Sequence, residues 1–498
     1  MTYLFSNSTV VVNEVEVKND VGNSIPVIGN VAVTGNVYLN NNSSIVTLSN
    51  PLPVTGNVTI PPVTGNVQIL GALAGINPDA FGRTRVSEPY TLGDYKHLYS
   101  IDPNFVDKLD FGGNVTFVAN KACATLTTNS HPSSNVVHQT KFYHVYLPGK
   151  SQLILSSICF GYAQRNVTKR TGYFDDQDGI YFEQQGGDLD NGTGKGNLHF
   201  VVRSFVNGYA DEADVGTYQR RVDQNNWNVD KCDGTGKSGF YLDPSKTQLF
   251  FTDFQWLGVG RVRCGFVHNG EFVVAHEYYH SNVLSTVYLS NPNLPVRCEM
   301  RNTGTTTGGS MDQICSTVAS EGGYVESGID FAVVQDTART TSNPGGTELP
   351  LIALRLKNTF NTSKNRISVK LNSLSLYAET NSILFKILKL PNMSYLTYTG
   401  NVANWVSVSN SSGVEYCTNA TTYADGDQLF SGFVPSGSSQ NSLSPVALGG
   451  LTTSKKNIIV QNIDSSNSEI YCVVVRTIST SVGATATVSA SLQWREIY

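Results

Sequence analysis

Turn-forming residues interrupt this chain so often that little room is left for helices. Between residues 104 and 389, short alternating or apolar runs such as 152–161 and 248–257 are separated by turn clusters such as 188–196 and 233–239. Runs of this length and composition are typical of strands. Two segments, 311–320 and 382–390, still permit a short helix. The sequence predicts an all-β chain, with an extended N-terminal β arm followed by antiparallel β-sandwich or jelly-roll domains.

The first 75 residues repeat a short motif. Segments 27–31, 33–37, 54–58 and 63–67 each place Gly-Asn between β-branched residues. Their irregular spacing excludes a fixed-period solenoid, and a lone segment of this kind has too little apolar area to hold a core. We expect an assembly arm that is ordered by packing on other chains or on the body of the protein, with a flexible linker as the alternative. The candidate arm residues are Val33, Gly35, Val37, Val54, Gly56, Val63 and Gly65.

Changes in composition divide the chain into four parts. The arm covers residues 1–75, and a junction of mixed Pro, Gly, charged and aromatic residues covers 76–103. A β-sandwich body is predicted for 104–390 and a separate C-terminal β domain for 391–498. At 498 residues the chain is long enough for each domain to bury its own core.

Charge and hydropathy exclude several functional classes. The net charge is −5, with 34 basic and 39 acidic residues and no dense basic block, so we expect no nucleic-acid partner. The longest apolar runs, 153–163 and 383–390, are shorter than the roughly 18–20 residues that cross a bilayer. No basic segment followed by an apolar core opens the chain, so export by a secretory signal is not expected. Eight cysteines without a CxxC pair indicate reduced thiols and assembly inside a cell.

One motif points to catalysis. His276, Glu277 and His280 match HExxH, which on a helix places two imidazoles on a zinc ion and a carboxylate beside the bound water. Glu299 is available as a third ligand. The surrounding residues, however, indicate strand, Asn-Gly hairpin and strand, and on a strand the two histidines lie about 13 Å apart. A zinc metallopeptidase is therefore kept only as an alternative.

Two further patterns fall short of a site. Residues 234–238 end like a phosphate-binding loop, but Lys231 stands where that motif needs glycine. The acidic clusters 175–179 and 188–192 offer oxygens to Ca²⁺ without the spacing of a known calcium loop. Both patterns are interpreted as surface turns.

Three segments carry a resemblance to known proteins. They are residues 77–87 after the repeats, the block 227–263 with Trp227-Asn228-Val229-Asp230-Lys231 and Gln255-Trp256-Leu257-Gly258-Val259-Gly260, and the C-terminal 491–498. Together they resemble virion structural proteins of large algal DNA viruses and tailed bacteriophages. The resemblance implies a capsid, vertex or fibre protein of a virus particle, with no enzymatic activity, no cofactor and no transferable binding site.

The resulting hypothesis is a minor capsid or vertex/fibre component that links subunits through its arm. Its expected partners are other capsid or fibre subunits, and we expect a symmetric homo-oligomer, with a trimer as the working hypothesis. Its expected location is the virion, assembled in the host cytoplasm. A different class of function, a host-recognition spike that binds cell-surface glycan, remains the main alternative, with Tyr278, Tyr279 and Trp405 as candidate stacking residues.

Overall fold

The computed structural model divides into two compact units, Met1–Arg85 and Val86–Tyr498. The structure describes Asn40–Asn41, Ser44–Ile45 and residues 89–498, except for 188–189, 191, 193, 336, 343–347, 399–400, 403, 438–445, 448–458 and 480. In the first unit, β1 (Asn40–Asn41) pairs antiparallel with β2 (Ser44–Ile45). The predicted arm residues Val33, Gly35, Val37, Val54, Gly56, Val63 and Gly65 lie outside the described residues.

The described part of the second unit is built from strands and confirms the predicted all-β fold. All its strand pairs are antiparallel. The helical elements in this part are three single 3₁₀ turns, η1 (Ala119–Lys121), η2 (Gln224–Asn226) and η3 (Met393–Tyr395). No helix among the described residues has the length and apolar character to span a bilayer.

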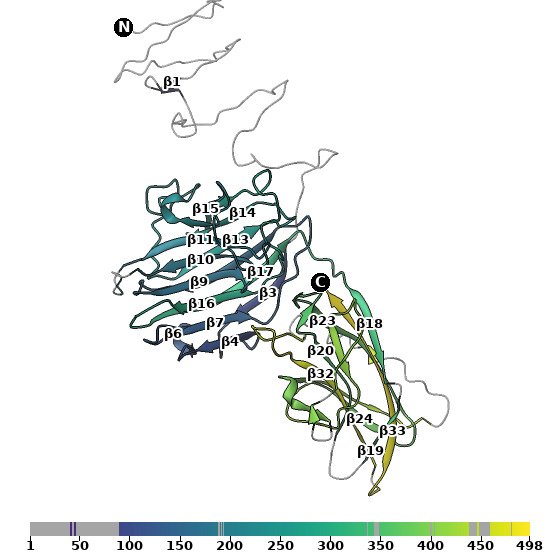
Figure 1. The fold of residues 1–498 in the computed structure, drawn as a ribbon. Helices are drawn as coiled ribbons and strands as arrows, with labels where there is room; N and C mark the ends of the chain where they lie inside the picture. Colours follow the sequence, from purple (N-terminus) through teal and green to yellow (C-terminus); the bar gives the residue numbers. More distant parts are fainter. Residues whose placement is uncertain are drawn as a thin grey trace, which may run out of the picture. The chain divides into compact units, whose positions relative to one another are not determined.

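Two large sheets stacked face to face form the first sandwich (Figure 1). In order, the seven-stranded sheet contains β12 (Arg221–Asp223), β11 (Asn197–Arg203), β10 (Gly179–Gln185), β9 (Val167–Phe174), β16 (Val296–Asn302), β7 (Asn135–Thr140) and β4 (Phe105–Asp110). The eight-stranded sheet contains β15 (Glu271–Tyr278), β14 (Val262–His268), β13 (Gln248–Phe254), β8 (Gln152–Cys159), β17 (Gly309–Glu321), β6 (Cys123–Thr128) and β5 (Asn114–Val118), with β3 (Pro89–Lys96) also paired to β17.

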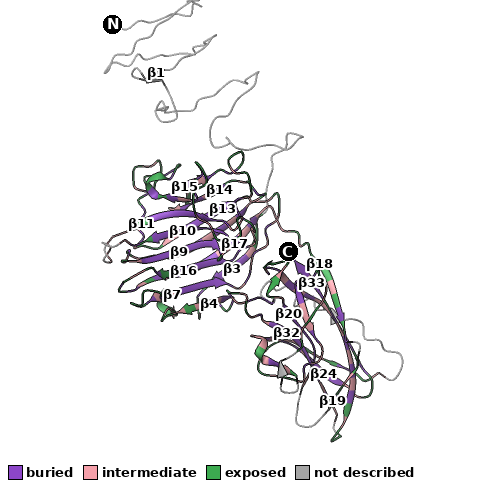
Figure 2. Cartoon of the chain, viewed as in Figure 1, coloured by how far each residue is buried: buried purple, intermediate pink, exposed green. Residues whose placement is uncertain are grey.

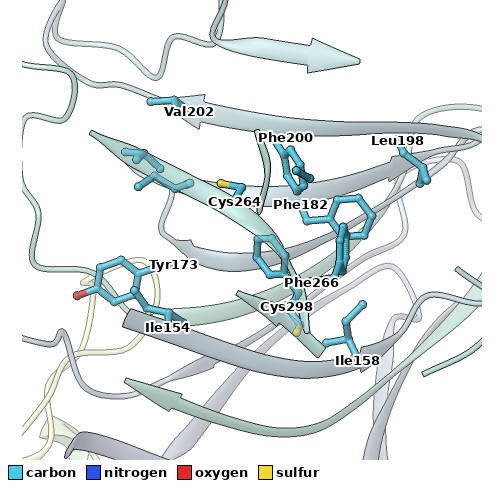
Figure 3. Close-up of a cluster of buried hydrophobic side chains, with 14 of the residues drawn as sticks. Ile154, Ile158, Tyr173, Phe182, Leu198, Phe200, Val202, Cys264, Phe266 and Cys298 are labelled. Carbon is cyan, nitrogen blue, oxygen red and sulfur yellow. The ribbon is translucent and has the colours of Figure 1, made fainter. Parts of the chain in front are cut away.

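The core of this sandwich lies between the two sheets. Side chains alternate in burial along β8, as expected for a strand with one face toward a core. Figure 3 shows the resulting cluster, in which Phe182 and Phe200 of one sheet meet Phe266 of the other. Their ring centroids lie 5.2–6.1 Å apart, within the range in which aromatic pairs add to the energy of burial.

The strand–hairpin–strand prediction around the HExxH segment is confirmed. Strands β14 and β15 are joined by Asn269-Gly270, whose φ angles are 52° and 86°. Two positive φ angles in a two-residue loop match the right-handed twist of the flanking strands, and Asn-Gly is the sequence that adopts them most easily. The HExxH residues are therefore placed at the end of a strand.

A second sandwich contains the remaining strands. Its smaller sheet contains β18 (Ile329–Val334), β33 (Thr485–Ile497), β23 (Ser368–Ala378) and β31 (Val446–Ala447), with β19 (Arg339–Ser342) also paired to β33. Its larger sheet contains β27 (Val406–Ser407), β28 (Val414–Cys417), β20 (Leu349–Leu356), β32 (Ile470–Thr477), β24 (Ile383–Leu390) and β30 (Asp427–Val434). Two small ribbons complete it, one of β21 (Thr359–Phe360) and β22 (Ser363–Lys364) and one of β26 (Asn401–Val402), β25 (Leu396–Tyr398) and β29 (Thr422–Tyr423).

This second sandwich has its own apolar core. Strand β33 alternates in burial up to its last residue and places Trp494, the largest fully buried side chain among the described residues, in the core of this sandwich. Figure 2 shows buried segments in the strands of both sandwiches and exposed segments mainly at their ends and edges. Each sandwich therefore buries an apolar cluster between its two sheets.

The two segments for which the sequence still allowed a short helix form strands in the structure. Residues 311–320 lie in β17 and residues 382–390 include β24, and both strands are central in their sheets. Each has a partner on both sides, β8 and β6 or β3 for β17, and β32 and β30 for β24. The helix expectation was wrong because this long-range pairing on both sides of each strand outweighs a weak local preference.

The sheets do not divide at residue 390 as the sequence suggested. Strands β20, β23 and β24, which precede that residue, pair with β28, β32, β33 and β30, which follow it. The first sandwich ends with β17 and the second begins with β18. The predicted junction 76–103 likewise contains β3, a strand of the first sandwich. Composition marked neither boundary, because both depend on which distant strands pair.

Candidate functional site

The HExxH residues do not converge on one point. His276 is buried on β15, and its Nδ1 accepts a hydrogen bond from the backbone N–H of Asn228 at 3.2 Å. His280 follows the strand and is also buried, with one ring nitrogen 2.8 Å from the Tyr218 hydroxyl and the other 2.5 Å from the Gly260 carbonyl. Burial lowers the pKa of both imidazoles to about 4. Both rings are therefore neutral and are held by separate protein partners.

The side chain of Glu277 contacts neither histidine's partners but a separate group of residues. Its carboxylate contacts Arg261 at 3.4 Å and accepts a hydrogen bond from the Tyr279 hydroxyl. Within the described ranges, no group of three or more His, Cys, Asp and Glu side chains is arranged to hold a metal ion. Glu299, considered as a third ligand, lies on β16 in the other sheet of the sandwich and is bound by arginines.

The acidic cluster at residues 175–179 is occupied by protein donors. Asp175 is buried, accepts hydrogen bonds from the backbone N–H groups of Gln177 and Asp178, and contacts Arg366 at 2.5 Å. Asp178 accepts from the backbone N–H and hydroxyl of Ser290. The cluster is a turn, as expected, but the expectation of a surface turn was wrong, because the side chains of Asp175 and Asp178 are buried and held by protein donors. The second acidic cluster lies partly outside the described residues.

The aromatic residues named for glycan stacking occupy different environments. Tyr278 is 2% exposed and belongs to the core of the first sandwich, whereas Tyr279 is 55% exposed. The ring of Trp405 is covered by the guanidinium of Arg355, whose carbon lies 4.5 Å from the ring centroid. None of the three lines the hollow described next.

Charged side chains form a row across the outer face of the seven-stranded sheet, the face turned away from the core. They lie outside because they alternate along each strand with core residues such as Phe182 and Phe200. The register aligns, one per strand, Asp223, His199, Glu183, Arg170, Glu299, Val137 and Lys108. Glu183, Arg170 and Glu299 alternate in charge on the three middle strands of this row, so these strands attract one another across it.

Arg170 and Arg297 connect the middle of the row. Arg170 donates from Nε to Glu183 at 2.7 Å and from Nη1 to Glu299 at 2.8 Å. Arg297 lies two residues before Glu299 on the same face of β16, and it donates to Glu299 at 2.5 Å and to Asp176 at 2.7 Å. Burial raises the pKa of Glu299, but the charges of Arg297 and Arg170 outweigh it and hold that pKa at about 2. Glu299 is therefore ionised throughout the physiological range.

The loop between β11 and β12 adds a fourth carboxylate to this network. Glu212 contacts Arg203 at 2.8 Å and Arg221 at 2.5 Å, and it accepts a hydrogen bond from the Tyr181 hydroxyl at 2.5 Å. Burial opposes ionisation of Glu212, yet Arg203 and its other neighbours lower the pKa to about 2. The loop is thus held down on the sheet by charge.

Two aromatic rings support the arginines from below. The guanidinium carbon of Arg297 lies 5.3 Å from the ring centroid of Phe174, and that of Arg170 lies 5.4 Å from the ring centroid of Tyr181. Arg203 lies over both rings, at 5.7 and 5.2 Å. Contacts of this kind restrict each guanidinium to one plane. The outer face is therefore a rigid array of oriented polar groups.

An open hollow of about 610 Å³ lies on this face. Nine of its 17 lining residues are charged, and they are Lys108, Asp110, Arg170, Asp176, Arg203, Glu212, Arg297, Glu299 and Arg301. The volume falls within the roughly 300–1,000 Å³ of sites that bind small molecules. A hollow lined by fixed donors and acceptors favours a ligand that is itself densely polar.

A strained turn places an aromatic ring among these lining residues. The turn 110–113 closes with a hydrogen bond from the Gly113 N–H to the Asp110 carbonyl at 3.1 Å. Its central residues, Phe111 and Gly112, both have positive φ, 51° and 83°. Such a turn prefers Asn-Gly, and a bulky residue at positive φ is rare. Phe111 is nevertheless 63% exposed, and one face of its ring stacks on His131 with centroids 4.7 Å apart.

Sequence reasoning missed this site, although one signal was present. In β16 the order Arg297-Cys298-Glu299-Met300-Arg301 alternates charged and apolar residues, which places three charges on one face of a single strand. Similar alternation occurs in β10 at Tyr181 and Glu183. The pairing that joins these charges into a row involves residues more than one hundred positions apart, so the hollow itself was not visible in the sequence.

No protein-family model and no curated protein matches the chain. Several solved structures share a distant likeness with it. The carbohydrate recognition domain of Emp47p is 11% identical over 47% of this chain and 96% of its own, with a TM-score of 0.27. A protein of Shewanella oneidensis MR-1 is 8% identical over 53% and 100%, with a TM-score of 0.29. The CBM2 module of the evolved Dit protein of Lactobacillus casei BL23 phage J-1 is 6% identical over 48% and 100%, with a TM-score of 0.28. Nothing about the ligand or role of this chain follows from likeness at this level.

Proposed function

We propose that this protein is a component of a virus particle that binds carbohydrate in the hollow on its seven-stranded sheet. The hollow is the observation that carries the binding role. It combines oriented carboxylates and guanidiniums, which pair with sugar hydroxyls, with one exposed aromatic ring, on which the C–H face of a sugar stacks. The role is one of binding, and no catalytic step is proposed.

The strain at Phe111 supports this proposal. A residue held in a rare backbone conformation costs about 1–3 kcal/mol, and such residues cluster at binding sites. Burial offsets only part of this cost, because more than half of the surface of Phe111 is exposed. Contact with a ligand explains why an aromatic residue occupies a position where asparagine fits the backbone better.

Assignment to a virus particle rests on the sequence resemblance at residues 77–87, 227–263 and 491–498. In this setting, host recognition is the role that a carbohydrate site serves. The repeated segments within residues 27–67 support a second, separate proposal, in which the N-terminal arm links the protein to neighbouring subunits in a homo-oligomer. Deleting residues 1–70 is expected to leave a folded protein that no longer assembles, and unchanged assembly would contradict the arm proposal.

A glycan array probed with the full-length protein tests the carbohydrate site. We expect binding to a subset of glycans, and at least a tenfold loss of binding in Phe111→Asn, because the variant keeps the turn but removes the ring. Tyr241→Asn is the matched control, since Tyr241 is 60% exposed and does not line the hollow. Silence across a broad array would reject a carbohydrate ligand, and equal losses in both variants would reject the hollow as its site.

A further inference from the structure

Two of the cations in the hollow differ from the rest. Arg170, Arg203 and Arg297 are each paired with carboxylates. Lys108 and Arg301 also line the hollow, but neither forms an ion pair or a side-chain hydrogen bond with any described residue. Two cations of the hollow therefore have free donors.

Three of the four carboxylates that line the hollow are paired with arginines. Glu299 and Glu212 each contact two arginines, and Asp176 contacts Arg297. Asp110 accepts a hydrogen bond from the Asn135 side chain at 3.0 Å. Of the charged lining residues, five are basic and four acidic, so the net charge is 5 − 4 = +1. A ligand that enters the hollow thus meets two cations without a carboxylate partner, Lys108 and Arg301, and one carboxylate, Asp110, whose side-chain partner is an amide.

Lys108 and Arg301 lie near enough to act on one ligand. Lys108 is opposite Val137, and Arg301 is opposite Asn135, on the two sides of β7. Two strand spacings of about 4.8 Å separate them, with an offset of two residues along the strand. Their long side chains span such a distance. Arg301 is exposed and Lys108 half-buried, so both are accessible to a ligand.

Lys108 has one further electrostatic neighbour. The pKa of Asp464 is lowered by a hydrogen bond from Ser466 and, more weakly, by the charge of Lys108. The two groups form no ion pair, so this interaction leaves the donors of Lys108 free. Arg301 has the greater exposure and is the stronger of the two anchors.

We propose that the hollow selects carbohydrates that carry an anionic group, a carboxylate or a sulfate, which binds Arg301 and Lys108. This inference rests on the proposed carbohydrate site. A guanidinium presents paired donors that match the oxygens of a carboxylate or sulfate, and an ammonium adds a second point charge. The four acidic residues of the hollow disfavour a nucleic-acid backbone, which needs a continuous run of cations.

The same glycan array tests the preference for anionic glycans separately from the proposed carbohydrate site. We expect the strongest signals on glycans that end in sialic or uronic acid or carry sulfate, compared with the same glycans lacking that group. Arg301→Ala is expected to weaken acidic-glycan binding at least tenfold and Lys108→Ala severalfold, while Arg301→Lys retains part of it. Lys237→Ala, an exposed lysine that does not line the hollow, should bind as the unmodified protein does.

Each outcome has a distinct meaning. Equal binding of acidic and neutral glycans, or full binding in Arg301→Ala, would overturn the anionic inference and leave the carbohydrate site standing. No binding to any glycan would overturn both. Competition by poly-glutamate as effective as that of the best acidic glycan would show that charge alone is recognised, and would overturn the assignment to carbohydrate. A preference between carboxylated and sulfated members identifies which anion the site accepts.

Both acidic glycans and Arg301 are ionised at neutral pH, so binding is expected to weaken as salt is raised. Screening shortens the range of the interaction to about 8 Å at physiological ionic strength. A salt dependence that disappears in the double variant Lys108→Ala/Arg301→Ala would support these two residues as its source. An unchanged dependence in that variant would assign it elsewhere and contradict the inference.

Discussion

The two faces of the seven-stranded sheet are built from the same strands but are stabilised in different ways. On β10, Ile180 and Phe182 face the core, while Tyr181 and Glu183 face outward, and all four are buried. The inner face gains free energy by removing apolar area from water. The outer face buries charges, which is favourable only because the buried carboxylates Glu183 and Glu299 have guanidinium partners. Burial on a sheet thus does not imply an apolar environment.

This difference predicts which substitutions each face tolerates. The inner face depends on volume, so loss of a large side chain is costly whereas a swap of similar size is not. The outer face depends on complete pairing, so loss of one charge is costly even where the volume is unchanged.

The largest expected effect is a cavity on the inner face. Phe182 contacts several core rings from both sheets, and Phe182→Ala should lower the free energy of unfolding by about 3–5 kcal/mol. Denaturant titration followed by circular dichroism measures the loss. Phe182→Leu, which retains most of the volume, should cost much less. Equal costs for the two variants would contradict the role assigned to volume.

On the outer face, removal of a single charge should be nearly as costly. Glu299→Gln keeps the shape but leaves Arg170 and Arg297 with an incomplete set of partners, so we expect a loss of about 3 kcal/mol. Asp176→Asn is the matched control, because Asp176 contacts the same Arg297 but its side chain is 49% exposed. That variant should cost less than about 1 kcal/mol. Similar losses in both variants would show that burial does not set the cost.

The pH dependence of the free energy of unfolding should also distinguish the two faces. Glu299 has a pKa of about 2, below its usual 4.5, so the folded protein holds fewer protons than the unfolded chain between these values. Stability is fully present above pH 4.5 and is lost as the pH falls toward 2, by up to about 3 kcal/mol for this group. Denaturant midpoints at a series of pH values measure this. Phe182→Ala should lower the whole curve, whereas Glu299→Gln should also flatten its acid limb.

Buried histidines should lower the free energy of unfolding at a higher pH than the carboxylates do. His276 and His280 have pKa values of about 4 when folded and an ordinary value of 6.5, so the unfolded chain binds more protons between pH 6.5 and 4. Stability should therefore begin to fall below pH 6.5, before the carboxylates titrate. His280→Gln should remove its share of the early loss and leave the later one unchanged. A flat curve between pH 6.5 and 4.5 would contradict neutral burial of both rings.

Local sequence was sufficient for some of this structure and not for the rest. The alternation along β33 and the Asn-Gly turn after His268 are visible within about ten residues, and the all-β fold and the β14–β15 hairpin follow from them. The division of the sandwiches depends on β20, β23 and β24 pairing with strands that follow residue 390, which local composition does not encode. The HExxH match could be found in the sequence because its three residues lie within a segment of five. The hollow assembles charges from four strands, β4, β9, β11 and β16, and from the segments that follow β9 and β11, and it was not predicted.

The smallest expected effect concerns the edge of the outer face and has the opposite sign. Phe111→Asn replaces a bulky residue at a φ of 51° by one that adopts this conformation readily, so the variant should be more stable by about 1 kcal/mol. Gly112→Ala in the same turn should destabilise it, because Gly112 has a φ of 83°, a conformation that residues with a Cβ rarely adopt. A variant that is more stable yet binds glycan less well would show that the turn gives up stability for contact with a ligand. If Phe111→Asn is less stable than the unmodified protein, Phe111 serves its own packing on His131, and its backbone strain no longer supports a binding site.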